Sequence, residues 1–585
     1  DMLHFSVLPN HRRWSALLGG LRYVIIDEAH RYQGVFGAHV AQVLRRLRRL
    51  AAAHGAEPTI LLSSATAPNA ADFGGALIGE NRVEVVADST APVTARTVVL
   101  WQPSASLNRD TSRLLAGLAD DATQTLAFVA SRAGAELTSL EAAELAAEPG
   151  RIASYRGGYL AMERRDLEAA LQTGEILGLA TTNALQLGID VSGIDAVLVS
   201  GFPGKLSAFW QQAGRAGRAG REALVVLLAR ENPLDAYLLQ HPELIFDAPV
   251  EAAICHPQNP HVLGPHLAAA AQEQPLTAAD ERWFGPTALP LAAHLAAGKV
   301  LRDRGGTWYW TRPDRAVDHI NLRSTTPRPV EIIERSTGQV IGVVDPAAAD
   351  RTVHRGAVYL HQGRSFVVTE LDVEERRAMV VAAHNPWYTQ AESAQDITVL
   401  REHRLRPLGS TTLHFGDVRL SWQVTGYLRR DETTHEVLDS TPLDCPEHTL
   451  TTQAVWWSVP ETLERELGWG SLRLGAAAHA AEHTSIGLLP AFAPCDRWDI
   501  GGVSTARHPD TGLATVFVHD GLPGGAGFAA RAHEVAEQWV AATLERLRTC
   551  RCESGCPACV VSPKCGNANQ LLDKTAATEL LRRIL

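Results

Sequence analysis

The sequence predicts an α/β fold for the first 235 residues, followed by three smaller modules. Short apolar runs alternate with amphipathic stretches up to residue 228, and each run is apolar on both faces. This pattern is typical of a parallel sheet that helices cover on both sides. Beyond residue 228 the chain changes to Ala- and Leu-rich helical segments, then to Val-, Thr- and Tyr-rich strands, and it ends in a dense group of cysteines.

The α/β part is expected to form a doubly wound sheet, because strands and helices alternate along the chain. The expected strands are Tyr23–Ile26, Thr59–Leu62, Thr125–Val129, Ile176–Ala180, Ala196–Val199 and Ala223–Leu228. The expected helices are 37–53, 107–120, 132–147 and 163–173.

Composition and charge limit the classes of protein that fit. No run of about 18 apolar residues is present, so we expect no membrane span and no membrane partner. Residues Asp1–Phe5 do not combine a basic stretch with an apolar core, so no signal peptide is visible and we expect a cytoplasmic protein. The net charge of −11 argues against a generally basic nucleic-acid binder, but it is compatible with a local basic channel.

Two charged segments indicate nucleotide chemistry. Asp27 and Glu28 directly follow the first apolar strand, where nucleotide hydrolases place a magnesium ligand and a water-activating base. Far downstream, Arg215 and Arg218 lie one helical turn apart, and two rigid guanidiniums at this spacing suit a polyphosphate. Taken alone, the first pair is equally compatible with an ordinary helix N-cap, and the second with a solvated Gly/Arg loop.

Five segments in this order resemble the motifs of superfamily 2 helicases of the DEAH type. The resemblance implies two RecA-like lobes, the first truncated at 1–95 and the second at 96–235, with ATP and Mg²⁺ as cofactors. The segments are Asp27–His30 (motif II), Ser64–Thr66 (motif III), Phe128–Arg132 (motif IV), Thr181–Asp190 (motif V) and Gln211–Arg218 (motif VI).

The resemblance also implies roles for individual residues. Asp27 would hold magnesium through water, and Glu28 would orient the attacking water. Arg218 would be the arginine finger with Arg215 as its partner, and Gln211 would orient the water or the finger. The other implied contacts are His30, Gly188 and Asp190 with the nucleotide, and Ser131, Arg132, Thr181 and Thr182 with the nucleic-acid backbone.

The chain departs from the helicase pattern at its start. A helicase of this type needs a Gly-x-x-x-x-Gly-Lys-Ser/Thr loop before motif II to hold the β- and γ-phosphates. Only 26 residues precede Asp27, and none of them forms such a loop. We therefore expect that the chain begins inside the first lobe, with Asp1–His4 as the end of the segment that precedes motif II in relatives. A natural protein without ATPase activity is the alternative.

The middle of the chain predicts two modules. Residues 236–318 are expected to be winged-helix-like, because short helices over 261–300 precede a hairpin at 301–310 with Gly305 and Gly306 at its tip. A plain helical spacer is the alternative. Residues 319–425 are expected to form a small β-rich domain, with strands Val340–Val344, Ala357–Leu360, Arg364–Leu371 and Met379–Ala383.

The C-terminal part, 426–585, is expected to be an α+β zinc-binding domain. Five of the eight cysteines lie between Cys550 and Cys565, in a chain too long and otherwise too poor in Cys for a disulfide scaffold. Their spacing, Cys-x-Cys-x3-Cys-x2-Cys, is typical of zinc, which takes four ligands in a tetrahedron. The expected ligands are Cys550, Cys552, Cys556 and Cys559, with Cys565 as the alternative to Cys550.

This ending resembles the zinc-binding module of the mitomycin repair factor A (YprA-like) helicases. The matching segments are Cys552–Cys559, Ser562–Asn567 and the glycine loop Asp520–Phe528. The resemblance implies an ATP-dependent 3′-to-5′ DNA helicase that loads on single-stranded DNA or on duplex DNA with a 3′ tail, acts in DNA repair and has a repair nuclease as a candidate partner. An RNA helicase and a nucleic-acid-binding scaffold without ATPase activity are the alternatives.

Overall fold

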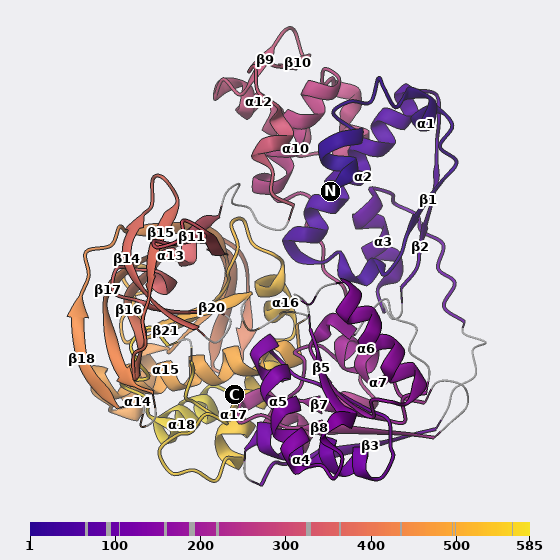
Figure 1. Cartoon of the computed structure of the whole chain (residues 1–585). Coiled ribbons are helices and arrows are strands. Elements are labelled where there is room, and N and C mark those ends of the chain that lie inside the picture. The colour runs from indigo at the N-terminus through magenta and orange to yellow at the C-terminus, as the bar shows by residue number, and fades with distance from the viewer. Residues whose placement is uncertain are drawn as a thin grey trace.

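The computed structural model describes the chain with several gaps. In Figure 1 the N-terminal helices and the winged-helix region lie together at the top, the second α/β lobe lies below them, and the β-rich C-terminal half lies to the left. The described residues are all except 65–67, 89–94, 105, 157–158, 160, 186–192, 218–221, 323–328, 362–363, 433, 435, 494, 496, 498 and 564.

The first lobe has two parallel strands at the predicted positions, β1 (Tyr23–Ile26) and β2 (Thr59–Leu62). Its helices are η1 (Leu3–Val7), α1 (Ser15–Gly19), η2 (Ala29–Arg31), α2 (Gly34–Ala53) and α3 (Ala70–Ile78). Side chains on one face of the strands, such as Ile26, pack against α2 and α3. On the other face Ile25 is 72% exposed and Leu61 is 47% exposed. The prediction of strands covered on both faces is therefore wrong for this lobe, because the described helices pack on one face.

The second lobe is a six-stranded parallel sheet in the order β3-β8-β7-β4-β6-β5. Its strands are β3 (Arg96–Trp101), β4 (Thr125–Phe128), β5 (Ile152–Tyr155), β6 (Gly178–Thr181), β7 (Ala196–Ser200) and β8 (Ala223–Leu228). Its helices are α4 (Leu107–Asp120), α5 (Arg132–Leu145), η3 (Pro149–Arg151), α6 (Ala161–Thr173), η4 (Asn183–Leu185), α7 (Leu206–Ala213), α8 (Pro233–Gln240) and α9 (Glu243–Phe246).

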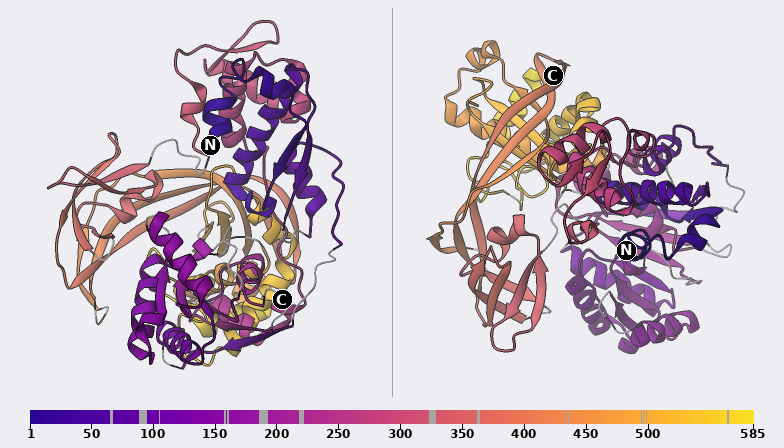
Figure 2. Two further views of the ribbon diagram at one scale, coloured as in Figure 1. Left: turned by 45° about the vertical axis from the view of Figure 1, so that its right-hand side comes forward. Right: turned by 90° about the horizontal axis from the view of Figure 1, so that it is seen from above.

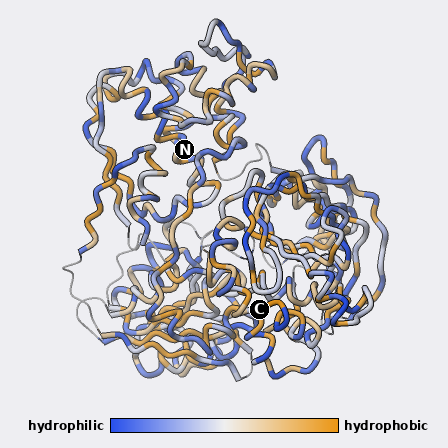
Figure 3. The backbone as a smooth tube through the Cα atoms, turned by 180° about the vertical axis from the view of Figure 1, so that it is seen from behind, coloured by the Kyte–Doolittle hydropathy of each residue, from blue (hydrophilic) through white to orange (hydrophobic). Residues whose placement is uncertain are grey.

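The central strands of this sheet are buried on both faces, as predicted. Every residue of β4, β6 and β7 is buried, and separate apolar clusters lie on the two sides of the sheet. Figure 3 shows hydrophobic segments gathered through this lobe. Strands β3 and β5 were not predicted, because β3 is only partly buried and β5 mixes buried apolar residues with Ala153 and Ser154.

The winged-helix prediction is confirmed. Strands β9 and β10 pair as an antiparallel hairpin, and Gly305 and Gly306 at its tip have φ values of 64° and 84°, which glycine adopts without steric cost. The elements are α10 (Pro260–Glu273), η6 (Ala278–Asp280), α11 (Glu281–Phe284), α12 (Ala288–Ala297), β9 (Leu301–Asp303), β10 (Trp308–Trp310) and η7 (Ala316–His319).

The winged-helix module and the first lobe share one hydrophobic core, in which Leu8, Leu18 and Leu47 pack with Leu263 and Phe284. A buried polar network crosses the same interface. The fully buried Arg46 guanidinium pairs with Glu273 of α10, and it contacts His4 at 2.9 Å and His266 at 3.3 Å. His266 in turn lies 3.0 Å from His39 of α2.

Burial makes this network sensitive to acid. It lowers the pKa of His4 to about 3 and of His39 to about 4, and it lowers the pKa of His266 well below 6.5. Between these values and the unfolded value of about 6.5, the unfolded state binds more protons than the folded state. The stability that these neutral histidines contribute is therefore fully present above about pH 6.5, and it is lost as the pH falls below this value.

We expect the free energy of unfolding to drop between pH 6.5 and 4.5, by up to about 1.4 kcal/mol per pH unit for each buried imidazole. Denaturant midpoints at pH 7, 6 and 5 measure this. His39→Gln is expected to flatten the pH dependence, whereas His294→Gln, at an exposed position on α12, is expected to leave it unchanged. Equal slopes in both variants would refute the assignment.

The β-rich region begins with a five-stranded sheet in the order β12-β11-β15-β14-β13. All four predicted strands are present to within two residues. The elements are β11 (Val330–Glu334), β12 (Val340–Val344), α13 (Pro346–Thr352), β13 (Val358–His361), β14 (Arg364–Asp372) and β15 (Arg377–Ala382).

The division at residue 425 is not a domain boundary in the structure, because it falls inside β17 (Thr411–Asp431). This strand pairs along its whole length with β16 (Trp387–Leu408), and the hairpin belongs to the C-terminal sheet β16-β17-β19-β21-β20. Figure 2 shows these long strands curving across the molecule. The remaining strands are β18 (Val437–Pro442), which pairs with β17, β19 (His448–Ser458), β20 (Ile500–Thr505) and β21 (Thr515–Asp520).

Helices pack against this C-terminal sheet around the largest core of buried residues. Two helices follow the glycine loop and meet at Val535. No helix in the described part of the chain combines the length and apolar character needed to cross a bilayer. The C-terminal helices are α14 (Glu461–Leu467), α15 (Ser471–Leu488), η8 (Leu489–Ala491), α16 (Phe528–Glu534), α17 (Ala536–Thr549) and α18 (Lys574–Ile584).

Candidate functional site

The acidic pair lies at the carboxyl end of β1. The exposed Asp27 carboxylate accepts hydrogen bonds from the Ser63 hydroxyl at 2.5 Å and from the backbone N–H of Glu28 at 2.9 Å. These hydrogen bonds lower the pKa of Asp27, and the bond from Ser63 has the larger effect. An ionised carboxylate facing solvent is what a hydrated cation requires.

Glu28 has a left-handed backbone conformation, with φ 50° and ψ 46°. This conformation is uncommon for residues other than glycine, and strained residues of this kind cluster at functional sites. The Glu28 side chain is 39% exposed, and its carboxylate lies 3.4 Å from His30 Nδ1.

His30 joins the two lobes. Its Nδ1 lies 3.1 Å from the Ser64 hydroxyl, and its Nε2 lies 2.5 Å from the side-chain amide nitrogen of Gln211 on α7. The Gln211 amide donates to Nε2, so the proton of a neutral imidazole is on Nδ1; burial lowers the pKa of His30, in keeping with this form. Both ring nitrogens face protein groups, so His30 forms a contact between the lobes, and its predicted contact with the nucleotide stays a prediction.

Part of the predicted nucleotide site lies outside the described residues. This holds for Arg218, Gly188 and Asp190, and for Ala65 and Thr66 of motif III. Arg215 is described; it follows α7 and is only 8% exposed. The roles of the two arginines and of the two motif V residues therefore stay predictions.

The residues predicted to contact nucleic acid lie at the carboxyl ends of the neighbouring strands β4 and β6, whose last residues, Phe128 and Thr181, are paired. Ser131 and Arg132 are exposed, and the Ser131 hydroxyl caps α5 by accepting from the backbone N–H of Gly134 at 3.0 Å. Thr181 has no exposed surface, and its hydroxyl donates to the Thr182 carbonyl at 3.1 Å. A direct contact between the Thr181 side chain and a phosphate therefore requires this segment to move.

The C-terminal domain also reaches the cleft, which sequence reasoning missed. A cavity of about 430 Å³ lies between the lobes. The buried Asp520 carboxylate accepts from the N–H groups of Gly527 at 2.9 Å and Ala529 at 2.8 Å, which holds the glycine loop at this cavity, and burial raises the pKa of Asp520 to about 6. The cavity is lined by His30, Gln33 and Phe36 of the first lobe, Lys205, Ser207 and Gln211 of the second, and Asp499, Leu522 and Phe528 of the C-terminal domain.

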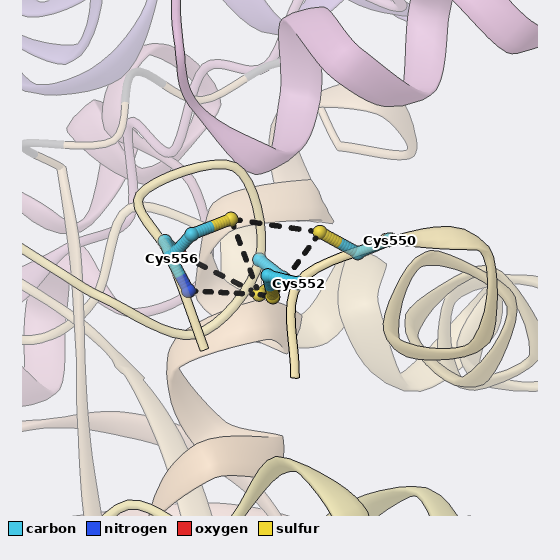
Figure 4. Close-up of side chains that lie close together, drawn as sticks. Cys550, Cys552 and Cys556 are labelled. Carbon is cyan, nitrogen blue, oxygen red and sulfur yellow. Dashed lines mark hydrogen bonds between the residues drawn. The ribbon is translucent and has the colours of Figure 1, made fainter. Parts of the chain in front are cut away.

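The four cysteines favoured for zinc converge between α17 and α18. Figure 4 shows three of them, Cys550, Cys552 and Cys556. Cys550 Sγ lies 3.5 Å from the sulfurs of both Cys552 and Cys556. Cys559 Sγ lies 3.4 Å from Cys552 Sγ and 3.7 Å from Cys556 Sγ. Zinc–sulfur bonds of about 2.3 Å in a tetrahedron place sulfurs roughly 3.8 Å apart, so the thiols fit zinc.

Cys565, the alternative ligand, lies elsewhere: its Sγ is 3.6 Å from His479 Nε2. Lys574 supports the four-cysteine group instead. Its ammonium donates to the carbonyls of Cys550 at 2.7 Å and Cys552 at 2.5 Å, and to Cys552 Sγ at 3.3 Å. A cation at this position offsets the negative charge of four thiolates.

Family models match four successive parts of the chain. They are DEAD/DEAH box helicase at 2–73, helicase conserved C-terminal domain at 108–220, the winged helix domain of ATP-dependent helicase HRQ1 at 255–325, and the MrfA Zn-binding domain at 481–560. The ATP-dependent helicase YprA of Bacillus subtilis (strain 168) is 33% identical over 577 residues, which cover 96% of this chain and 76% of that protein.

The chain belongs to the YprA family of ATP-dependent helicases. Solved structures agree with membership of the YprA family. A crystal structure of the helicase MrfA bound to DNA is 32% identical to the chain, with a TM-score of 0.69, and the match covers 100% of this chain and 79% of that one. The helicase hrq1 of Schizosaccharomyces pombe is 29% identical over 100% of this chain, which spans 58% of the length of that relative.

ATP and zinc are thus the cofactors of this YprA-type chain, since its helicase domains match and its four cysteines converge. Three residues at these sites could have been found from the sequence. Lysine occurs at only four positions, and of these Lys205 lines the cleft while Lys574 supports the cysteines. Ser63 had a signal too, because it directly precedes the motif III segment.

Proposed function

We propose that this chain carries the motor and DNA-binding parts of an ATP-dependent 3′-to-5′ DNA helicase that acts on single-stranded DNA, or on duplex DNA with a 3′ tail, in DNA repair. The observation that carries the proposal is the hydrogen-bonded series from Gln211 through His30 to Ser64. It links motif VI of one lobe to motifs II and III of the other. Hydrolysis or release of the γ-phosphate of ATP could then change this contact between the two lobes, as translocation requires.

The acidic pair divides the chemistry. Asp27, ionised and exposed, would hold Mg²⁺, which when bound neutralises phosphate oxygens. Glu28 would accept a hydrogen bond from the attacking water and so orient it. The Gln211 amide nitrogen donates to His30, and Gln211 would orient the attacking water or the finger, while Arg215 and Arg218 would stabilise charge on the transferring phosphoryl group.

The nucleic-acid strand would cross the second lobe at the exposed start of α5. Ser131 and Arg132 lie there, and Thr182 follows the neighbouring strand β6. A helix N-terminus favours phosphate, and Arg132 adds a fixed positive charge. We propose DNA and not RNA as the substrate, because the similar structure of MrfA, with a TM-score of 0.69, is of that helicase bound to DNA. A repair nuclease remains a proposed partner.

We expect the 585-residue polypeptide alone to show no significant ATPase activity, because the phosphate loop normally supplies the amides and lysine that neutralise the β- and γ-phosphates. The same polypeptide extended at its N-terminus by a phosphate-loop segment is expected to hydrolyse ATP, with stimulation by single-stranded DNA and unwinding of 3′-tailed but not 5′-tailed duplexes. Glu28→Gln in the extended version is the control and should abolish turnover.

Each contrary outcome selects an alternative. Stronger stimulation by single-stranded RNA than by DNA would favour an RNA helicase. DNA binding without turnover in the extended version would favour a scaffold. Turnover by the unextended polypeptide that Glu28→Gln abolishes would contradict the expected need for the loop.

A further inference from the structure

We infer that the chain carries a second metal site, formed by His479, His483 and Cys565, which binds a zinc-like divalent cation beside the four-cysteine group. The ligand atoms of these three residues all lie within 4.8 Å of one another. His479 and His483 come from helix α15, and Cys565 comes from the loop after the four cysteines. This site is separate from the four-cysteine group and shares no ligand with it.

The separation of the ligand atoms fits a tetrahedral metal. Cys565 Sγ lies 3.6 Å from His479 Nε2. Zinc bonds of about 2.0–2.1 Å to nitrogen and 2.3 Å to sulfur place these two atoms roughly 3.6 Å apart in a tetrahedron. The two histidines are four residues apart and so lie on one face of the helix, with ring centroids 4.3 Å apart.

Both imidazoles are oriented as metal ligands are. His479 Nδ1 lies 3.2 Å from the Leu571 carbonyl, and His483 Nδ1 lies 2.7 Å from the Val560 carbonyl. Each carbonyl fixes the proton on Nδ1 and leaves Nε2 with its lone pair. Metal-binding histidines almost always donate their second ring nitrogen in this way, often to a backbone carbonyl.

The loop that carries Cys565 is held in a strained shape. Ala568, Asn569 and Leu571 have positive φ values of 57°, 65° and 54°. Such residues are uncommon outside glycine, and they persist where the surroundings over-determine the backbone. The Asn569 side chain helps to hold this loop, since it bonds both the N–H and the carbonyl of Ser562 at 2.8 and 2.9 Å.

The three ligands are those that zinc prefers, and they leave one coordination position of a tetrahedral metal without a protein ligand. Two imidazoles and one thiolate are typical zinc ligands, and three protein ligands leave a fourth place for water. The buried Glu482 lies between the histidines in sequence, a His-x-x-Glu-His spacing that zinc hydrolases use. Here, however, the Glu482 carboxylate accepts from the Ser504 hydroxyl at 2.5 Å, so we assign metal binding to the site and no hydrolysis.

The site would tie α15 to the zinc-binding module. Among the described residues, the Cys565 thiol donates to Asn567 Oδ1 at 2.7 Å. With a metal, helix α15 and the loop are joined by bonds to one ion. Because α15 also packs against β20 and α18, the four-cysteine group and the C-terminal sheet would then move as one unit.

Metal analysis of the purified chain tests the inference. After dialysis against a weak chelator, the unaltered chain is expected to retain about two zinc ions. Cys565→Ser and His479→Gln are each expected to lower this to about one. Cys445→Ser, at a half-buried cysteine outside both groups, is the matched control and is expected to keep two. One zinc in the unaltered chain, unchanged in both variants, would overturn the inference.

A measurement on the unaltered chain covers the case in which the variants fail to fold. Crystals examined at the zinc absorption edge are expected to show one anomalous peak among the four cysteines and a second among His479, His483 and Cys565. A peak among the four cysteines together with ordinary density for a Cys565–Asn567 hydrogen bond would refute the second site.

Discussion

Arg218→Ala is expected to lower the ATPase rate by about a thousandfold or more in a version of the chain that supplies the phosphate loop. An arginine finger acts on the transition state, where charge on the transferring phosphoryl group must be stabilised. The segment that leads to Arg218 begins at Gln211, which already contacts His30 of the other lobe. This places the start of motif VI at the cleft and supports the assignment.

Two companion variants sharpen the test. Arg218→Lys is expected to restore little activity, because an ammonium cannot reproduce the planar fork of a guanidinium. Arg165→Ala, at an exposed position on α6, is the matched control and is expected to keep normal turnover. The measurement is steady-state ATPase with saturating single-stranded DNA, alongside DNA affinity at fixed salt.

DNA binding distinguishes a finger from a strand contact. A finger faces the cleft between the lobes, so Arg218→Ala is expected to leave nucleotide-free DNA affinity nearly unchanged. If affinity and turnover fall in proportion, Arg218 contacts the strand and the cleft assignment is wrong. If turnover stays near normal in both variants, it is a solvated loop arginine.

Cys559→Ser is expected to release the zinc of the four-cysteine group and to unfold the segment between α17 and α18. Structural zinc contributes roughly 10–16 kcal/mol of binding free energy in zinc-finger peptides, and much of it is folding free energy. Cys559 is 1% exposed and its sulfur contacts two other ligands. The loss should also free Thr484 of α15, which donates to the Cys559 carbonyl at 3.3 Å.

Zinc content and protease resistance measure this outcome together. Cleavage is expected to begin near residues 550–560 in Cys559→Ser, while the second lobe stays resistant. Cys495→Ser, at a buried cysteine outside both metal groups, controls for the loss of a buried sulfur. Retention of zinc at this site with unchanged protease resistance would show that these four cysteines are not the ligands.

The local elements of the α/β lobes were largely predictable. Strands β1, β2 and β8 and helix α4 have the bounds that periodicity predicted. When one or both faces of a helix or strand are buried, its apolar residues repeat at a fixed period. This period can be recognised within the segment, without reference to the rest of the chain. Strands β3 and β5 were missed because their burial is partial, so their patterns are weak.

The candidate sites divide in the same way. The four cysteines favoured for zinc could be singled out by spacing because all lie within one loop of ten residues, from Cys550 to Cys559. The exclusion of Cys565 from that group could not be predicted. Cys565 lies beside His479, which is 86 residues away in the sequence, and spacing does not show such a contact.

The sequence by itself determined the helicase class, the acidic pair and the cluster of cysteines, because each rests on short motifs whose residues lie close together in the chain. Only the tertiary structure decided that His30 meets Gln211 across 181 residues, and that the winged-helix module shares a core with the first lobe. It also decided that β16 and β17 form one long hairpin in the C-terminal sheet. The physical reason is that side-chain packing between distant segments sets these contacts, and spacing along a chain carries no record of which segments pack together.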